Sequence, residues 1–278
     1  RVIAHLLQDA VYYLKPGGIV AIVVVSPLAP LVADILSADE GTSPPLDVIL
    51  RQDRARHSVF HYRCGDKPPI MPENAFERGI YHRAEPTITF ESLEFPMQTA
   101  YGLPEFDTLS YRTELLLERM LSIPLDPRQR NTPPIKRAIV FNPGQGHIPV
   151  ALWQRFKPAH IALVDRDLLS LRYAQHNLIL NGCPENQISL THHVDVQLQS
   201  HEPADLVTGI LREDEGQEAI AHTIAQIGEQ LMPGSTALVA GSSTAVTRLT
   251  KYSQTKKFFK AKKRKRTKGR SAITLKRI

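Results

Sequence analysis

The 278-residue chain has few cysteines, few aromatic residues and no long apolar run. Its two cysteines, Cys64 and Cys183, are far apart and lack metal-ligand spacing, which excludes a disulfide framework and a zinc cluster. We therefore expect two unpaired thiols and a cytoplasmic location. No apolar run reaches about 18 residues, so a membrane-spanning helix is excluded. The chain starts at Arg1 instead of methionine, which indicates a fragment or a trimmed chain.

Acidic residues are absent from the C-terminal end. From Lys251 onward there are 13 lysines and arginines and no acid, which leaves 21 basic against 28 acidic residues before that point. This polarity favours a polyanionic partner, with nucleic acid first. The candidate RNA-binding residues are Lys256, Lys257, Lys260, Lys262, Lys263, Arg264, Lys265 and Arg266.

Two interpretations of this basic hairpin stay open. Its side chains could contact an RNA backbone, or they could be a solvated edge whose lysines prevent edge-to-edge strand pairing. Phe258 and Phe259 stand at its start, and at least one should be core, since neighbours on a strand point to opposite faces.

Strand and helix patterns alternate from residue 135 onward. Strands are predicted at 138–142, 160–165, 187–191, 205–209 and 236–240, and helices at 147–155, 167–181, 216–231 and 243–251. A hairpin of strands near 256–264 and 271–277 follows. The pattern predicts an α/β fold with a Rossmann-like, doubly wound, mostly parallel sheet and a C-terminal antiparallel hairpin.

The first 63 residues repeat the last part of this pattern. A helix, Lys15-Pro-Gly-Gly18, an apolar strand at 19–25, a short helix and a hairpin correspond to the elements from 216 onward. The β-branched run at 19–25 predicts a central strand buried on both faces. We expect residues 1–66 to be the C-terminal remnant of a degenerate first copy of the fold.

Two further regions complete the expected organisation. Residues 67–134 are predicted to be a connector and the N-terminal segment of the second copy, with a strand at 87–90 and a helix at 108–122. Residues 135–278 are predicted to be the complete second copy.

The stretch from residue 138 to Asp165 has the pattern of a nucleotide-type site. A strand ends in Asn142-Pro-Gly-Gln-Gly-His147, a helix follows, and the next strand ends at Asp165, about 20 residues after the glycines. Gly144 and Gly146 would let the backbone approach a ligand, and Asp165 would accept hydrogen bonds from a ribose diol. A nucleoside-containing cofactor is predicted; the alternative is a Rossmann-like domain that has lost its ligand.

Residues 101–277 resemble the methyltransferase-small (MTS) domain of class I S-adenosylmethionine-dependent methyltransferases. They are similar in particular to the tandem-domain ribosomal RNA guanine-N2 methyltransferases. The resemblance rests on the segment Tyr101–Ser110, the glycine motif and Asp165. It implies S-adenosylmethionine as cofactor, held by Asn142, Gly144, Gly146 and Asp165, with Asp195 beside the adenine. It also implies methylation of RNA, ribosomal RNA first, by direct in-line transfer without a metal.

Two positions depart from the family. An acid usually stands at Asn142, and only an acid could make a charge-assisted contact to the cofactor's amino group. The family's catalytic Asn-Pro-Pro-Phe is replaced by Ile210-Leu-Arg-Glu213, so the catalytic residue stays unassigned. The alternatives are a catalytically inactive pseudo-methyltransferase serving as an RNA-binding or assembly module, or catalysis by the absent part of the first copy.

Three smaller features have ordinary interpretations. His192 and His193 are adjacent on a strand and point to opposite faces, which argues against a metal site. Residues 213–215 are interpreted as a solvated acidic loop, with a replacement active-site acid as the alternative. Trp153 is expected in the core. The oligomeric state is not predicted.

Overall fold

A computed structural model describes residues 2–37, 46–65, 74–125, 135–196, 202–212, 216–255 and 257–278. The chain divides into two compact units, Arg1–His82 and Arg83–Ile278. None of the helices in the described ranges is long and apolar enough to cross a membrane. Cys64 and Cys183 are both buried and unpaired, as expected.

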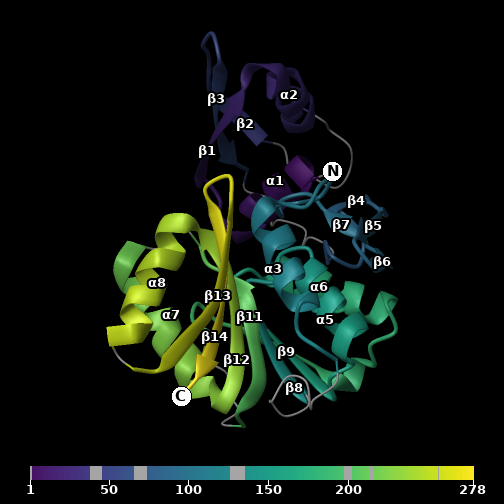
Figure 1. Ribbon diagram of the computed structural model, residues 1–278. Helices are drawn as coiled ribbons and strands as arrows, with labels where there is room; N and C mark the ends of the chain where they lie inside the picture. The colour runs from purple at the N-terminus through teal and green to yellow at the C-terminus, as the bar shows by residue number, and fades with distance from the viewer. Residues whose placement is uncertain are drawn as a thin grey trace. The chain divides into compact units, whose positions relative to one another are not determined.

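The larger unit is built on a seven-stranded sheet with the order β10-β9-β8-β11-β12-β14-β13 (Figure 1). Its strands are β8 (Arg137–Phe141), β9 (His160–Asp165), β10 (Ile188–His192), β11 (Ala204–Ile210), β12 (Leu231–Ser242), β13 (Phe259–Thr267) and β14 (Arg270–Arg277). Strands β8 to β12 pair in parallel, and β14 runs antiparallel between β12 and β13. The predicted α/β fold, with its mostly parallel sheet and terminal antiparallel hairpin, is confirmed.

Helices cover both faces of this sheet (Figure 1). They are α3 (Tyr111–Leu121), α5 (His147–Phe156), α6 (Leu168–Leu180), α7 (Gly216–Gln230) and α8 (Ser243–Thr255). Successive strand residues point to opposite faces. Thus Ala138 and Val140 join the core beneath α3, α5 and α6, whereas Ile139 and Phe141 join the core beneath α7 and α8. A strand covered on both faces is apolar where it is buried, which explains the run of four apolar residues from Ala138 to Phe141 in β8.

Strand β12 is longer than predicted because it includes the Pro233-Gly234 turn. Ala204 of β11 pairs with Leu231, and pairing resumes between Leu206 and Thr236, so the intervening residues form a bulge. Gly234 has a φ of 79°, which glycine adopts at little cost.

Four short strands precede α3. They are β4 (His82–Ala84), β5 (Thr87–Phe90), β6 (Leu93–Pro96) and β7 (Thr99–Ala100), paired β4 with β7 and β5 with β6. Strand β5 was predicted, and α3 begins after Ser110, whose side chain accepts from the backbone N–H of Thr113. Because Phe95 and Met97 are fully buried in the core beneath α3 and α5, this stretch is part of the fold.

The smaller unit contains a three-stranded antiparallel sheet with the order β1-β3-β2. Its elements are α1 (Val2–Tyr13), β1 (Ile19–Val25), η1 (Ser26–Leu28), α2 (Ala29–Ser37), β2 (Leu46–Asp53) and β3 (His57–Cys64). This order reproduces β12-β14-β13. The first hairpin strand carries a bulge in both sheets, after Val48 and after Ala261. That residues 1–66 are the remnant of a first copy of the fold stays a prediction.

The prediction that residues 19–25 form a central strand buried on both faces is wrong. Within the described residues β1 is an edge strand, and Ile19, Val23 and Val25 are each more than half exposed. An apolar β-branched run indicates a strand but does not say how many neighbours it has. The corresponding strand β12 differs because β11 pairs along its other edge.

Candidate functional site

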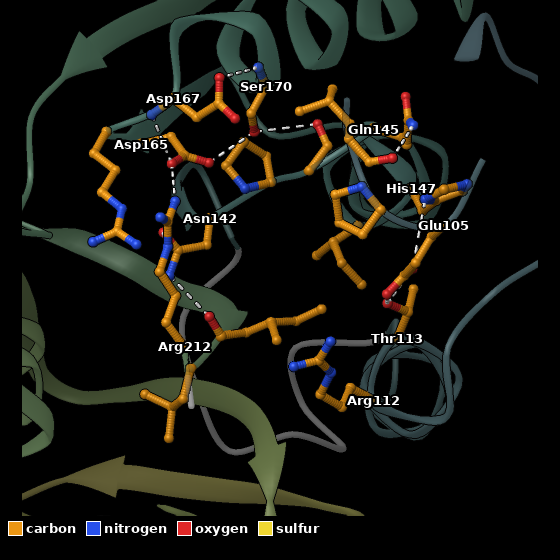
Figure 2. A pocket seen from close by; sticks show the side chains of 18 residues that line it. Glu105, Arg112, Thr113, Asn142, Gln145, His147, Asp165, Asp167, Ser170 and Arg212 are labelled. Atoms are coloured by element: carbon orange, nitrogen blue, oxygen red, sulfur yellow. Dashed lines mark hydrogen bonds and ion pairs between the residues drawn. The ribbon is translucent and has the colours of Figure 1, made fainter. Parts of the chain in front are cut away.

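A cavity of about 290 Å³ lies at the C-terminal ends of β8, β9 and β11 (Figure 2). The chain winds outward from β8 to β9 and β10 on one side and from β11 to β12 on the other. The cavity therefore lies at the point where the strand order reverses, which is where open α/β sheets bind their ligands.

The two predicted glycines have different roles in the turn after β8. Gly144 lines the cavity with a φ of 57°, and a Cβ added there would meet no described atom within 4 Å. Gly146 has a φ of 102°, and an added Cβ would lie 2.9 Å from the Cα of Ala174 in α6. Gly144 can thus admit a ligand, whereas Gly146 allows α6 to pack against the turn.

Asp165 is 3% exposed at the end of β9, and its carboxylate is well bound. Oδ1 accepts from the backbone N–H of Asp167 at 3.0 Å, and Oδ2 accepts from Ser170 Oγ at 2.7 Å. The guanidinium of Arg212 also donates to Oδ1 and forms an ion pair with it. A ribose diol that binds this carboxylate must therefore compete with Arg212.

Asn142 links the ends of β8 and β11. Its Nδ2 donates to the carbonyl of Ile210 at 2.9 Å, and its Oδ1 accepts from Arg212 Nε at 3.0 Å. An aspartate could not make the first of these bonds, because a carboxylate has no hydrogen to donate. The Asn142 side chain therefore requires an amide to bond both Ile210 and Arg212 in the segment after β11.

Asp195 is not among the residues that line the main cavity. It lines a second cavity of about 20 Å³ whose wall also includes Asp165, Arg212 and Val196. Its carboxylate is 3.4 Å from His222 Nε2. The predicted residues Asn142, Asp165 and Asp195 are thus brought together, with Arg212 among them.

The opposite side of the main cavity was not predicted from the sequence. Figure 2 places Glu105, Arg112, Thr113 and His147 there, facing Asp165 and Arg212 across the cavity. Thr113 Oγ1 donates to the two oxygens of Glu105 at 2.9 and 2.7 Å. Burial lowers the pKa of His147 to about 4, although the nearby Glu105 acts to raise it.

Gln145 fixes the segment before α3 to the glycine turn. Its buried amide accepts from the N–H of Ala100 at 3.0 Å and donates to the carbonyls of Ala100 and Leu103 at 3.0 and 3.3 Å. Asn177 of α6 donates to the carbonyl of Gln145 at 2.7 Å. These bonds hold the segment that contains Glu105. They join residues far apart in the sequence, so no local sequence pattern predicts them.

The basic hairpin β13–β14 presents a mostly exposed row of cations. Lys256 lies outside the described residues. The exposed members of the predicted set are Lys257, Lys260, Lys262, Lys263, Lys265 and Arg266. Lys265 pairs with Glu118 of α3. The neighbouring Lys268 donates to the hydroxyl of Tyr111 at 2.5 Å.

Arg264 differs from its neighbours because it is half-buried. It donates to the carbonyl of Ser243 at 2.8 Å and to Thr247 Oγ1 at 2.9 Å, and so ties the hairpin to α8. Phe259 is buried, as expected for at least one of the two phenylalanines, and Phe258 is partly buried.

The remaining candidates are placed as follows. His192 Nε2 lies 3.0 Å from the carbonyl of Arg166, and His193 Nδ1 accepts from the N–H of Asp195. Trp153 is in the core, as expected. Residues 213–215 lie outside the described residues.

The strand order and the cavity together define a class: the chain has the fold of the S-adenosylmethionine-dependent methyltransferases. It is similar to the solved 16S rRNA N2 guanine methyltransferase RsmC of T. thermophilus, in complex with AdoMet and guanosine. The TM-score is 0.65 and the identity 14%, over 99% of this chain and 69% of that one. At this identity the similarity establishes the fold alone.

Two other solved structures are more distant. The ribosomal protein L11 methylase of Lactobacillus delbrueckii subsp. bulgaricus has a TM-score of 0.48 and 16% identity, over 60% of this chain and 78% of that one. An rRNA methylase of Streptococcus thermophilus has a TM-score of 0.46 and 12% identity, over 62% and 99%. These overlaps are too low to carry an argument. No protein-family model and no curated protein matches the chain.

Proposed function

We propose that this chain is an S-adenosylmethionine-dependent methyltransferase that acts on RNA. Ribosomal RNA is the proposed substrate, and the N2 amino group of guanine is the proposed acceptor. The observation that carries the proposal is the cavity at the strand-order reversal, lined by Gly144 and by the buried Asp165. The similar T. thermophilus enzyme, with AdoMet and guanosine, supports the same cofactor and acceptor class.

The residues of the cavity fit a nucleoside-containing cofactor. Asp165 offers a buried carboxylate to the ribose hydroxyls once Arg212 moves from it, and Gly144 leaves room for the chain of the cofactor. The adenine would lie beside Asp195, in the adjoining cavity of about 20 Å³, which must widen as Arg212 moves. When bound, the cofactor supplies an electrophilic methyl group on a sulfonium.

Two buried, unpaired thiols agree with a cytoplasmic location.

The protein's part in the reaction is to position the acceptor and exclude water. The residues around the cavity would hold an exocyclic amine in line with the cofactor's methyl group. The amine nitrogen would take the methyl group, the thioether would leave with the electrons of the C–S bond, and the amine proton would pass to solvent, so alignment is the main requirement. The segment Ile210–Arg212 occupies the place of the family's amine clamp. Ile210 and Leu211 have apolar side chains, so Arg212 is the polar side chain of this segment that lines the cavity and could contact the acceptor.

The basic hairpin supplies the proposed RNA contact. The affinity for RNA should fall with salt, and each phosphate contact in single-stranded nucleic acid contributes about −0.7 to the slope of log affinity against log salt. Replacing Lys260, Lys262 and Lys263 with glutamine should therefore make this slope shallower by about 2. Filter binding to ribosomal RNA between low and moderate salt measures this slope. A matched variant that removes three exposed cations of the smaller unit, at Lys15, Arg54 and Arg56, should leave the slope unchanged. Equal effects of both variants would contradict a specific contact.

Methyl transfer itself is the direct test of the function. The chain is incubated with methyl-labelled S-adenosylmethionine and unmodified ribosomal RNA, and the digested RNA is analysed by mass spectrometry. We expect N2-methylguanosine with the wild-type chain and none with Asp165→Asn. RNA retention without any methylated nucleoside would instead favour the pseudo-methyltransferase alternative.

A further inference from the structure

Glu105 is a largely buried carboxylate without a basic partner. Its side chain is 12% exposed, and its oxygens accept only from the Thr113 hydroxyl among the hydrogen bonds of the described residues. No lysine or arginine in the described ranges lies within ion-pair distance of it. A carboxylate held away from water is costly unless a cation accompanies it. The arrangement indicates that a cation from outside the protein completes the pairing.

The neighbouring His147 does not supply that cation. Its Nδ1 is 3.9 Å from Glu105 Oε2, which is too long for a hydrogen bond. With a pKa of about 4, the imidazole is neutral at neutral pH. Its Nε2 is buried and has no hydrogen-bond partner in the described structure, although the residue lines the cavity. Among the described residues, this end of the cavity therefore contains a carboxylate without a cation and an imidazole nitrogen without a hydrogen-bond partner.

The position of Glu105 is enforced by the fold. Its backbone has a φ of 66°, a left-handed conformation that is unfavourable for a non-glycine residue. The bonds from Gln145 to Ala100 and Leu103 hold the preceding segment against the glycine turn. A strained, tethered acid that faces a cavity is typical of a binding group.

The opposite ends of the cavity have different chemistry. Asp165 lies at one end, where a ribose would bind, and Glu105 and the guanidinium of Arg112 line the other (Figure 2). At that end a carboxylate would attract an ammonium group and a guanidinium would attract a carboxylate, and these are the two charged groups of an amino acid. A ligand that spans the cavity would thus have a nucleoside at one end and an α-amino acid at the other.

We propose that Glu105 binds the α-ammonium group at the amino-acid end of the cofactor and replaces the acid that this chain lacks at Asn142. Arg112 lines the same end of the cavity. This inference rests on the proposed cofactor, and it adds a residue that selects ligands with an amino-acid tail over plain nucleosides.

The test compares two ligands that differ only in that tail. S-adenosylhomocysteine has the amino-acid end, and 5′-methylthioadenosine is the corresponding nucleoside thioether without it. Both are titrated calorimetrically into the wild-type chain, into Glu105→Gln, and into Glu94→Gln as a charge-matched control at an exposed acid. Glu105→Gln should weaken S-adenosylhomocysteine about tenfold to a hundredfold, the range of a charge-assisted bond, and change methylthioadenosine less than about twofold. Glu94→Gln should change neither.

Each other outcome overturns the inference. Equal weakening of both ligands by Glu105→Gln would mean a structural role, and no weakening would mean that the ammonium binds elsewhere. If the wild-type chain binds neither ligand, the proposed function fails and the inference fails with it. If Glu105→Gln does not fold, the wild-type chain is titrated with the desamino analogue of S-adenosylhomocysteine. That analogue should bind about tenfold to a hundredfold more weakly than the parent, and equal affinity would refute the proposal.

Discussion

Replacing Arg212 with glutamine should raise the affinity for S-adenosylmethionine while it destabilises the cofactor-free chain. The Arg212 guanidinium is bound to the carboxylate that we propose as the acceptor of the ribose hydroxyls, so cofactor and side chain would compete for Asp165. A hydrogen bond to a charged group contributes about 1.5–3 kcal/mol. Because the Arg212 side chain is 22% exposed, solvent weakens the contact, and we use the lower end of that range. Removing the competitor should therefore tighten binding about tenfold.

The stability of the cofactor-free chain should change in the opposite direction. Without Arg212 the buried Asp165 keeps the Ser170 hydroxyl and the Asp167 N–H but loses its cation. Removing one partner of a fully buried ion pair costs about 3–5 kcal/mol. With two donors remaining and one partner partly exposed, we expect a loss of about 1–2 kcal/mol in the free energy of unfolding.

Calorimetric titration and chemical denaturation measure the two effects on the same preparations. Arg248→Gln, at an exposed position on α8, is the control for loss of one positive charge and should alter neither quantity appreciably. Weaker binding of S-adenosylmethionine by Arg212→Gln would refute the reasoning, because Arg212 would then be a cofactor contact and not a competitor.

Two further predictions concern the glycine turn and the buried histidine. Gly146→Ala should lower the free energy of unfolding by about 2 kcal/mol or more, since its Cβ would meet the Ala174 backbone at 2.9 Å, whereas Gly144→Ala should cost about 1 kcal/mol and abolish cofactor binding. Thermal melting and titration separate the two, and similar melting temperatures would contradict the packing role of Gly146. The folded His147 pKa of about 4 lies below its ordinary value of 6.5, so the unfolded chain binds more protons between these values. Stability is therefore lost as the pH falls through that window, by up to about 3 kcal/mol, and denaturation at a series of pH values should show a shallower loss for His147→Gln.

The fold was largely predictable because it follows from local patterns. The all-apolar run of β8 and the spacing from the glycine turn to Asp165 are consequences of a strand covered on both faces and of a strand-helix-strand unit. The same local logic failed at β1, since the pattern of residues 19–25 is also compatible with an edge strand. What distinguishes β1 from β12 is the presence of a neighbour, which is a tertiary property.

The cavity was only half predictable for the same reason. Asp165 and Gly144 belong to one continuous motif, so spacing alone identifies them. Arg212 and Glu105 reach the cavity from segments on either side of that motif in the sequence, and only the packed sheet brings them to it. The one signal for Arg212 was its place after β11, where the sequence departs from the Asn-Pro-Pro-Phe motif of the methyltransferases that it resembles.

Titration of the chain with S-adenosylmethionine tests the central claim most directly. Isothermal calorimetry of the wild-type chain should give micromolar binding at one site, and Asp165→Ala, shown to be folded by its circular dichroism spectrum, should give none. No binding by a folded wild-type sample, or undiminished binding by Asp165→Ala, would contradict the assignment of this cavity as the cofactor site.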